Sequence, residues 1–290
     1  MQPAEVAQFC QYLRVRNYSP HTVGNYAIDL RLFFARSRKR PQQVTWRDVD
    51  RFIAGQHEGG LSAATINRRL NALKHFFDFL AGESNTAPIN PVKPSHHLRM
   101  GRSLPKKLTG AQVQQLFAVI DNEMDRALFL LMLRCGLRVS EVAGLKASDV
   151  DWEQEALLVR QGKGRKDRRV YLSTDALLGL RECLRQRPET VPGDYLFWNQ
   201  KRHGQPLSIK AIQKKMERYA KAAGIKASCH SLRHTFASNL LEEGAEVVSI
   251  KEFLGHSSVT SSERYARLSN RKIKQTYLQT IRRVISKTKV

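Results

Sequence analysis

Cysteine is scarce in this chain of 290 residues, and its four copies lie far apart. They form neither a C-x-x-C pair nor a disulfide framework, which predicts reduced, mostly buried thiols at Cys10, Cys135, Cys183 and Cys229. No run approaches the roughly 18 apolar residues that a membrane span needs. The first residues also lack the basic and apolar regions of a secretory signal. These absences favour a cytoplasmic protein.

Acidic residues are also few, with 26 Asp and Glu against 49 Lys and Arg, for a formal net charge of +23. Residues 1–100 hold 14 basic and 7 acidic side chains (+7), so residues 101–290 hold 35 and 19 (+16). An excess of this size in both parts predicts a polyanionic partner, for which nucleic acid is the first candidate. The alternative is a basic protein whose charge serves solubility alone.

The first 95 or so residues show the apolar spacing of helices. Ser19 followed by Pro20 predicts a helix start, as do Thr45 with Asp48 and, further on, Ser62. The first of these helices is expected to place on one side Val23, Tyr26, Ile28, Leu30 and Phe33. The helix after Ser62 repeats apolar residues at Ile66, Leu70, Leu73, Phe77 and Leu80. Its other face carries a polar and basic stripe, suited either to phosphates or to solvent, of Asn67, Arg68, Asn71, Lys74 and His75.

Proline, glycine and basic residues gather in residues 82–107, with prolines at 88, 91, 94 and 105. This composition predicts a linker. We therefore expect a helical DNA-binding domain over residues 1–90, a linker over 91–107, a second domain over 108–270 and a helical tail over 271–290.

The second domain is predicted to mix helices with a small sheet. The segment ALFLLMLRCG is expected to be a buried helix that ends at Gly136. Two β-like runs, residues 157–159 and 169–172, flank a turn rich in glycine and lysine, and residues 195–198 are a further extended candidate. Residues beyond Ser208 return to helical spacing. The predicted fold class is mainly α, with a small antiparallel sheet in the second domain.

Five segments of this domain carry candidate chemistry. Arg138, at the start of a helix, suits bidentate phosphate binding, or a structural ion pair with Glu141. Lys163 lies in the glycine-rich turn with Arg165 and Lys166, where an exposed lysine is the plainer interpretation. His230 and Arg233 share a helical face, and H-S-L-R-H lacks the glutamate of a zinc-binding H-E-x-x-H. His256 follows Gly255 at a helix end, and Tyr265 is one of eight tyrosines.

The order Arg138, Lys163, His230, Arg233, His256, Tyr265 resembles that of the tyrosine recombinase family, with closest likeness to Xer-type recombinases and related mobile-element integrases. LRVSEVAGL, GKGRKDRRV, HSLRHTFASNLLEEG, EFLGH and RYARL resemble the signature segments of the family's catalytic domain. TVGNYAIDLRLFF and INRRLNALKHFFDFL are similar to its N-terminal, SAM-like core-binding domain. The resemblance covers essentially the whole chain, and it implies two domains that close on DNA as a C-shaped clamp.

The resemblance implies a role for each residue. Arg138 and Arg233 would clamp the scissile phosphate, helped by His256, with Glu141 orienting Arg138. Tyr265 would attack phosphorus, His230 would take up or orient its proton, and Lys163 would protonate the leaving oxygen. DNA contacts are expected from Asn67, Arg68, Asn71, Lys74, Arg165 and Lys166. Neither a metal nor another cofactor is expected.

The implied partner is double-stranded DNA with an inverted-repeat core site, bound by a homotetramer in the nucleoid, with room for a second recombinase or accessory protein. Recombination through a 3′-phosphotyrosine and a Holliday junction would serve resolution, integration or excision. Two alternatives stay open: type IB topoisomerase-like relaxation, and a catalytically silent DNA-binding regulator. The tail, with Ile273, Tyr277, Ile281 and Val284 on one stripe, is expected to dock on a neighbouring protomer or on its own domain.

Overall fold

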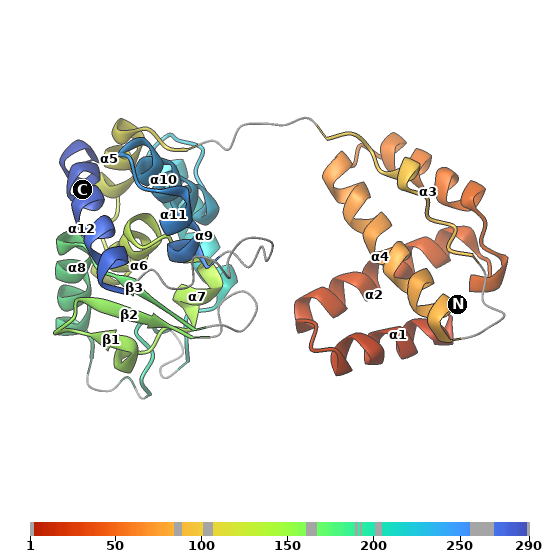
Figure 1. Cartoon of the computed structure of the whole chain (residues 1–290), viewed down its shortest axis with the longest axis horizontal. Coiled ribbons are helices and arrows are strands. Elements are labelled where there is room, and N and C mark those ends of the chain that lie inside the picture. Colours follow the sequence, from red (N-terminus) through yellow and green to blue (C-terminus); the bar gives the residue numbers. More distant parts are fainter. Residues whose placement is uncertain are drawn as a thin grey trace. The chain divides into compact units, whose positions relative to one another are not determined.

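The structure is a computed structural model that describes residues 3–83, 89–100, 107–160, 167–188, 191, 193–200, 205–255 and 270–288. The chain divides into two compact units, residues 1–103 and 104–290. Its described elements are mostly helices, and its strands form one three-stranded sheet (Figure 1). The predicted fold class is therefore confirmed. Across the described ranges, no helix is long and apolar enough to cross a membrane.

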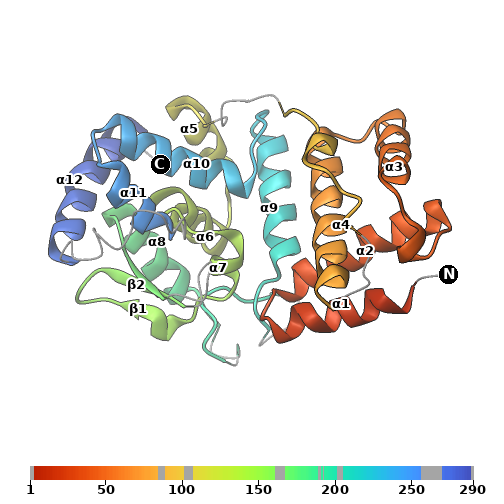
Figure 2. The same cartoon turned by 45° about the vertical axis from the view of Figure 1, so that its right-hand side comes forward.

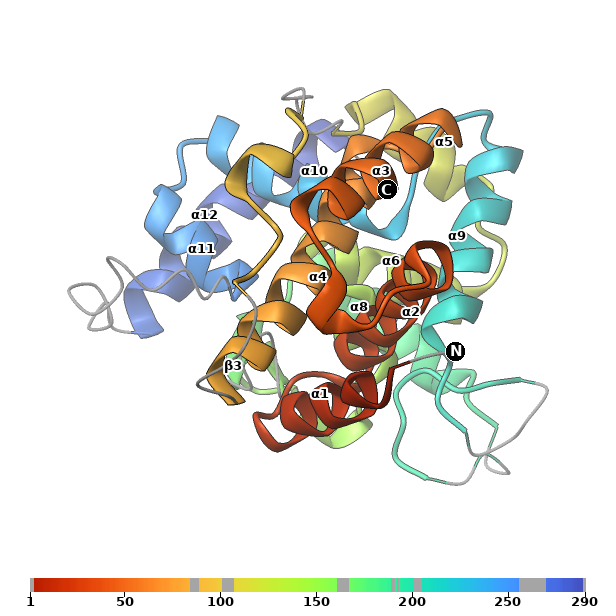
Figure 3. The same ribbon diagram turned by 90° about the vertical axis from the view of Figure 1, so that its right-hand side faces the viewer.

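Four helices and two short 3-10 turns build the N-terminal unit (Figure 3). The helices are α1 (Ala4–Val15), α2 (Pro20–Ser37), α3 (Trp46–Glu58) and α4 (Ala63–Glu83), and the turns are Pro41–Gln43 and Pro94–His96. The predicted helix starts are confirmed. The backbone N–H of Thr22 donates to Ser19 Oγ at 3.0 Å, and that of Thr45 donates to Asp48 Oδ2 at 2.8 Å.

Phenylalanines dominate the core of this unit. The ring of Phe76 contacts those of Phe9 and Phe34 edge-on, with centroids 5.6 Å apart in each pair. The prediction for Ile28 is wrong, because its side chain is 54% exposed. At 100° per residue, Ile28 lies about 140° around the helix from Val23 and so leaves the stripe that packs inward.

The C-terminal unit is built around the buried helix α6 (Glu123–Arg134). Helices α8 (Thr174–Arg185) and α10 (Cys229–Glu242) both pack against α6 (Figure 2). Further helices are α5 (Gly110–Ala118), α7 (Val139–Ala143), α9 (Ile209–Ala222) and α11 (Val247–Leu254), with a 3-10 turn at Ala147–Asp149. The four cysteines are free and buried, as predicted.

The sheet of this unit is antiparallel, in the order β1 (Val150–Asp151), β2 (Ala156–Val159) and β3 (Arg168–Tyr171). The two predicted runs thus form a hairpin, in which Leu157 pairs with Val170. Residues 195–198 do not join this sheet. Their Tyr195 and Trp198 instead make single bridges to Lys146 and Pro206.

The C-terminal helix α12 (Asn270–Thr288) packs on its own unit. Tyr277, Ile281 and Val284 are buried in one cluster with Phe236 and Phe253. The side chain of Ile273 lies outside the described residues. The three described members of the predicted stripe therefore cover their own domain.

Candidate active site

A tight corner between α6 and α7 positions Arg138. Gly136 has φ +64°, and a Cβ there would lie 2.4 Å from a ring carbon of Phe236, so glycine meets both a backbone and a packing requirement. The corner makes Arg138 the residue that precedes α7, and its backbone N–H donates to Glu141 Oε2 at 2.7 Å. The predicted ion pair is confirmed, with Arg138 Nη1 2.6 Å from Glu141 Oε1.

Glu141 is the shared acceptor of this region. Its side chain is 5% exposed, and Arg168 on β3 donates to both carboxylate oxygens, at 2.8 and 2.9 Å. Arg233 Nη1 lies 3.9 Å away. Burial raises the pKa of Glu141, but the hydrogen bonds and charges of Arg168 and Arg138 outweigh it and lower the pKa to about 2. Glu141 is therefore ionised at neutral pH and compensates part of the arginine charge.

The same three arginines bind the end of α11. Arg168 Nε donates to the carbonyl of Phe253 at 3.0 Å, Arg233 Nη2 to that of Leu254 at 2.6 Å, and Arg138 Nη2 to that of Gly255 at 3.3 Å. The last carbonyls of a helix lack intrahelical partners and lie at the negative end of its dipole. We call these three acceptors the α11 carbonyls. They fix the turn that directly precedes His256 in the sequence.

Arg233 is almost completely buried, at 5% exposure. Besides the Leu254 carbonyl, its guanidinium contacts the carbonyl of Gly136 at the corner before Arg138. Burial and the charge of Arg138 lower the pKa of Arg233 to about 10, so it stays protonated at neutral pH. Arg233 thus presents a fixed positive charge beside Arg138.

His230 lies in the first turn of α10, one turn before Arg233, and is exposed. Its ring meets that of His234 edge-on, with centroids 4.2 Å apart. Burial, followed by the charges of His234, Arg233 and Arg138, lowers the pKa of His230 below its ordinary value. A histidine that is neutral at pH 7 can accept a proton, which suits a general base.

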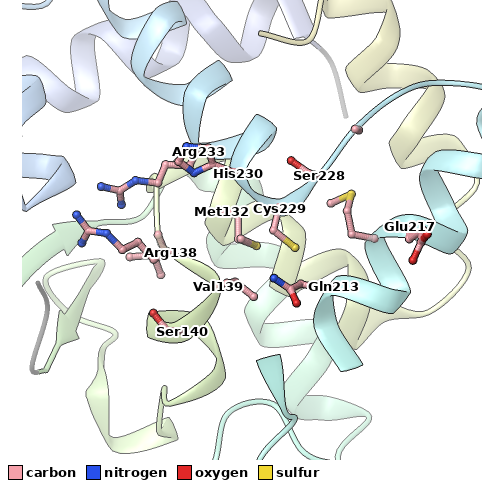
Figure 4. A pocket seen from close by; sticks show the side chains of 13 residues that line it. Met132, Arg138, Val139, Ser140, Gln213, Glu217, Ser228, Cys229, His230 and Arg233 are labelled. Carbon is pink, nitrogen blue, oxygen red and sulfur yellow. The ribbon is translucent and has the colours of Figure 1, made fainter. Parts of the chain in front are cut away.

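Arg138, His230 and Arg233 line one cavity of about 910 Å³ within the C-terminal unit. Arg138, His230 and Arg233 gather toward one end of it, and Gln213 and Glu217 of α9 lie toward the other (Figure 4). Two guanidinium groups beside a neutral imidazole can bind an anionic phosphate and move a proton next to it. The structure brings together three of the six predicted catalytic residues. Lys163, His256 and Tyr265, like Arg165 and Lys166, lie outside the described residues.

Tyr277 lies in the same unit but is not available as an alternative nucleophile in this arrangement. Its side chain is 1% exposed, and its hydroxyl donates to the carbonyl of Arg134 at 3.0 Å. Burial, reinforced by the nearby Cys135, raises the pKa of Tyr277 well above its ordinary value. A buried phenol cannot reach a DNA phosphate, and its raised pKa keeps it protonated.

Sequence reasoning missed Arg168. Side chains alternate along a strand, so Arg168 faces the same side as Val170, which is 1% exposed. A charged residue in register with a core residue is a detectable signal, because such a charge requires a buried partner.

The polar stripe of α4 is largely occupied by intramolecular bonds. Asn67 exchanges two hydrogen bonds with the backbone of Leu98, at 2.9 and 2.8 Å, and Arg68 binds the buried Asp29 through both amino groups. Asn71 contacts His97 at 3.0 Å, and Lys74 pairs with Asp78 at 2.6 Å. These contacts give the stripe a structural role, and its role in DNA binding stays a prediction.

Comparison with known proteins identifies relatives of both units. The model of the "Phage integrase family" matches residues 106–272, and that of the "Phage integrase, N-terminal SAM-like domain" matches residues 6–84. Tyrosine recombinase XerA of Pyrococcus horikoshii is 33% identical over 270 residues, covering 92% of this chain and 90% of that protein. Tyrosine recombinase XerC of Bacillus subtilis is 32% identical over 292 residues, covering 94% of each. A lambda integrase tetramer bound to a Holliday junction shares the fold, with 21% identity, a TM-score of 0.70 and coverage of 89% of this chain and 78% of that one.

Proposed function

The chain belongs to the phage integrase family and is a tyrosine-type site-specific recombinase, and we propose that the cavity at Arg138, His230 and Arg233 is where it cuts and rejoins DNA. The observation that carries the proposal is the convergence of two guanidinium groups and a neutral imidazole in one cavity. All three belong to the matched catalytic region.

The proposed reaction begins with phosphate binding. A phosphodiester repels nucleophiles because it is negatively charged, and further charge develops in the pentacoordinate transition state. Arg138 and Arg233 would bind the non-bridging oxygens, and His256 would donate a further hydrogen bond. Glu141 accepts hydrogen bonds from Arg138. The N–H groups of Arg138 that are not bound to Glu141 are therefore oriented before DNA binds.

Tyr265 is the proposed nucleophile. Its phenol oxygen forms a bond to phosphorus, and its proton passes to His230. The bond from phosphorus to the 5′ oxygen breaks, and Lys163 protonates that oxygen as it leaves. The resulting 3′-phosphotyrosine conserves the bond energy, so a 5′-hydroxyl from a second duplex can reseal the strand without ATP. Two such rounds, separated by a Holliday junction, exchange both strands.

Assembly follows from the same proposal. The solved lambda integrase tetramer on a Holliday junction supports a tetramer for this chain. We further propose that the tetramer is a homotetramer on an inverted-repeat site, and that the two domains of each protomer close on DNA as a C-shaped clamp. The domain limits of 1–90, 91–107, 108–270 and 271–290 belong to this proposal. We also propose that α12 can be exchanged between protomers. The face of α12 that here packs on its own unit would then pack on a neighbouring protomer. The assembly leaves room for a second recombinase or an accessory protein, and the reaction would serve resolution, integration or excision.

Covalent trapping tests the proposal. Cells that express the chain are denatured rapidly, and protein-linked DNA is recovered and sequenced beside a Tyr265→Phe control. We expect adducts at one inverted-repeat site that are absent from the control, because phenylalanine lacks the attacking oxygen.

Each other outcome supports a different function. Adducts spread over the genome would indicate topoisomerase-like relaxation. The complete absence of adducts would point to a missing partner or a silent active site, and would favour a DNA-binding regulator. Adducts that persist in Tyr265→Phe would show that the nucleophile is misassigned.

A further inference from the structure

Arg168 occupies a different place from the arginines that line the cavity. It begins β3, its side chain is 11% exposed, and it does not line the cavity that holds Arg138 and Arg233. Its two terminal nitrogens bind the two oxygens of Glu141, and its Nε binds the Phe253 carbonyl. The Nε and both terminal nitrogens of Arg168 therefore bind acceptors of the protein itself and do not face the cavity.

The contacts of Arg168 join the two segments that flank the cavity. Glu141 accepts hydrogen bonds from both the backbone N–H and the guanidinium of Arg138. By binding both oxygens of Glu141, Arg168 therefore also fixes the corner that presents Arg138. Phe253 lies in the last turn of α11, three residues before His256 in the sequence. One side chain on β3 therefore connects the Arg138 corner to the point from which the chain continues toward His256 and Tyr265.

The close approach at Gly255 shows how tightly Arg168 packs on this turn. A Cβ on Gly255 would lie 3.1 Å from Arg168 Nη1 and 3.2 Å from its Cδ, and Gly255 has φ +59°. The glycine therefore serves two purposes, a left-handed turn and direct contact with the guanidinium.

We propose that Arg168 is a positioning residue for the recombination reaction: it locks Glu141, and through it Arg138, to the α11 carbonyls in the geometry that cleavage requires. The inference rests on the proposed function, because it assigns Arg168 a task in presenting the groups named there. Arg168 does not touch the phosphate, so its removal affects cleavage and leaves DNA binding intact.

The test compares Arg168→Met with Arg169→Gln in the full-length chain. Arg169 is the next residue on β3, its side chain is 49% exposed, and it pairs with Asp151 at 3.5 Å, so its replacement removes the same charge from the opposite face. The probe is a nicked duplex that carries the site recovered by covalent trapping. We expect Arg168→Met to form the covalent complex about 10- to 100-fold more slowly, as for a small misplacement of catalytic groups, with single-site affinity unchanged. Arg169→Gln should cleave like the wild type.

Two further measurements separate positioning from general damage. Glu141 faces Arg138, Arg168 and Arg233, and its pKa rises without Arg168. Protonation of His230 slows both chains at low pH, so cleavage by Arg168→Met should decline more steeply than wild-type cleavage as the pH is lowered toward about 5, where wild-type Glu141 stays ionised. In a Glu141→Gln background, Arg168→Met should add little further loss, because the two residues act as one unit. If Arg168→Met does not fold, Arg168→Lys replaces it in the test. Lysine keeps the positive charge but lacks the two planar nitrogens that bind both oxygens of Glu141, so this variant should still cleave at least about tenfold more slowly than the wild type.

The outcomes distinguish the two proposals. A wild-type chain that forms no covalent adduct overturns the proposed function and this inference with it. Normal wild-type adducts, with Arg168→Met and Arg168→Lys cleaving as fast as Arg169→Gln, overturn the inference alone. Additive losses in the Glu141→Gln background would also overturn it, because they would show that Arg168 does not act through Glu141.

Discussion

Glu141 has two tasks, because the carboxylate that orients Arg138 also balances charge inside the fold. Three guanidinium groups lie within 4 Å of it, with nitrogen–oxygen distances of 2.6, 2.8 and 3.9 Å. Like charges packed this closely repel one another unless a counter-ion lies between them. The stability of the C-terminal unit and the geometry of the cavity therefore depend on the same side chain.

Glu141→Gln should destabilise the protein in a pH-dependent way. The pKa of Glu141 is lowered from 4.5 to about 2, so its ionised form stabilises the fold above pH 4.5, and this contribution is lost as the pH falls through about 2. The shift corresponds to about 3 kcal/mol at neutral pH. Urea unfolding at pH values from neutrality down to about 3 should show the difference between wild type and variant shrinking below pH 4.5.

Glu182→Gln is the matched control. The pKa of Glu182 is also lowered to about 2, by hydrogen bonds from Arg185 and Gln186, but its side chain on α8 is 35% exposed, against 5% for Glu141, and that of Arg185 is 72% exposed. Exposed pairs are screened by solvent, so this substitution should change stability little. Equal effects at both positions would show that burial of Glu141 does not matter.

At the level of elements, local sequence predicted most of the helices because their signals are local. Ser19 and Ser62 each accept a hydrogen bond from the backbone N–H three residues on, and Asp48 accepts one from the backbone N–H of Thr45. Such caps are visible without the fold. The contacts of Arg168 were not predictable in this way. Its partner Glu141 lies 27 residues away in the chain, and its partner Phe253, one of the α11 carbonyls, lies 85 residues away. The prediction for Ile28 was wrong for a different reason, because helical geometry already places Ile28 about 140° around α2 from Val23.

The anchoring of α12 can be tested through its polar contacts with α6. Tyr277 donates to the Arg134 carbonyl, and the fully buried Arg134 donates from Nη1 to Thr288 Oγ1 at 2.8 Å. Tyr277→Phe removes one such bond, worth about 1 kcal/mol, so amide hydrogen exchange in α12 should accelerate roughly fivefold. Ser286→Ala is the control, because the Ser286 hydroxyl donates only within its own helix, to the Arg283 carbonyl at 2.8 Å.

If α12 exchanges no faster in Tyr277→Phe than in Ser286→Ala, the hydroxyl does not hold the helix in place. Faster exchange confined to α12 would show that the helix can open separately from α6. Such separate opening is what docking on a neighbouring protomer requires.

At the scale of the whole molecule, the charge of +23 predicts DNA affinity that depends steeply on salt. Each phosphate that a cation neutralises releases counterions, so the logarithm of the binding constant falls with the logarithm of salt concentration by about 0.9 per contact. Both units carry excess positive charge, and both are proposed to touch DNA. Removing one phosphate contact from the N-terminal unit should therefore reduce the slope by about one.

Lys74→Gln and Arg185→Gln test this at equal loss of charge. Lys74 lies on α4, 50% exposed and paired with Asp78, and Arg185 lies on α8, 72% exposed and paired with Glu182. A DNA contact is predicted for Lys74 and none for Arg185, so only Lys74→Gln should lower the slope when affinity is measured over a series of salt concentrations. Equal reductions would show that charge acts as a diffuse field over the whole surface. An unchanged slope in Lys74→Gln would place the DNA away from this face of α4, and its polar stripe would then serve the fold alone.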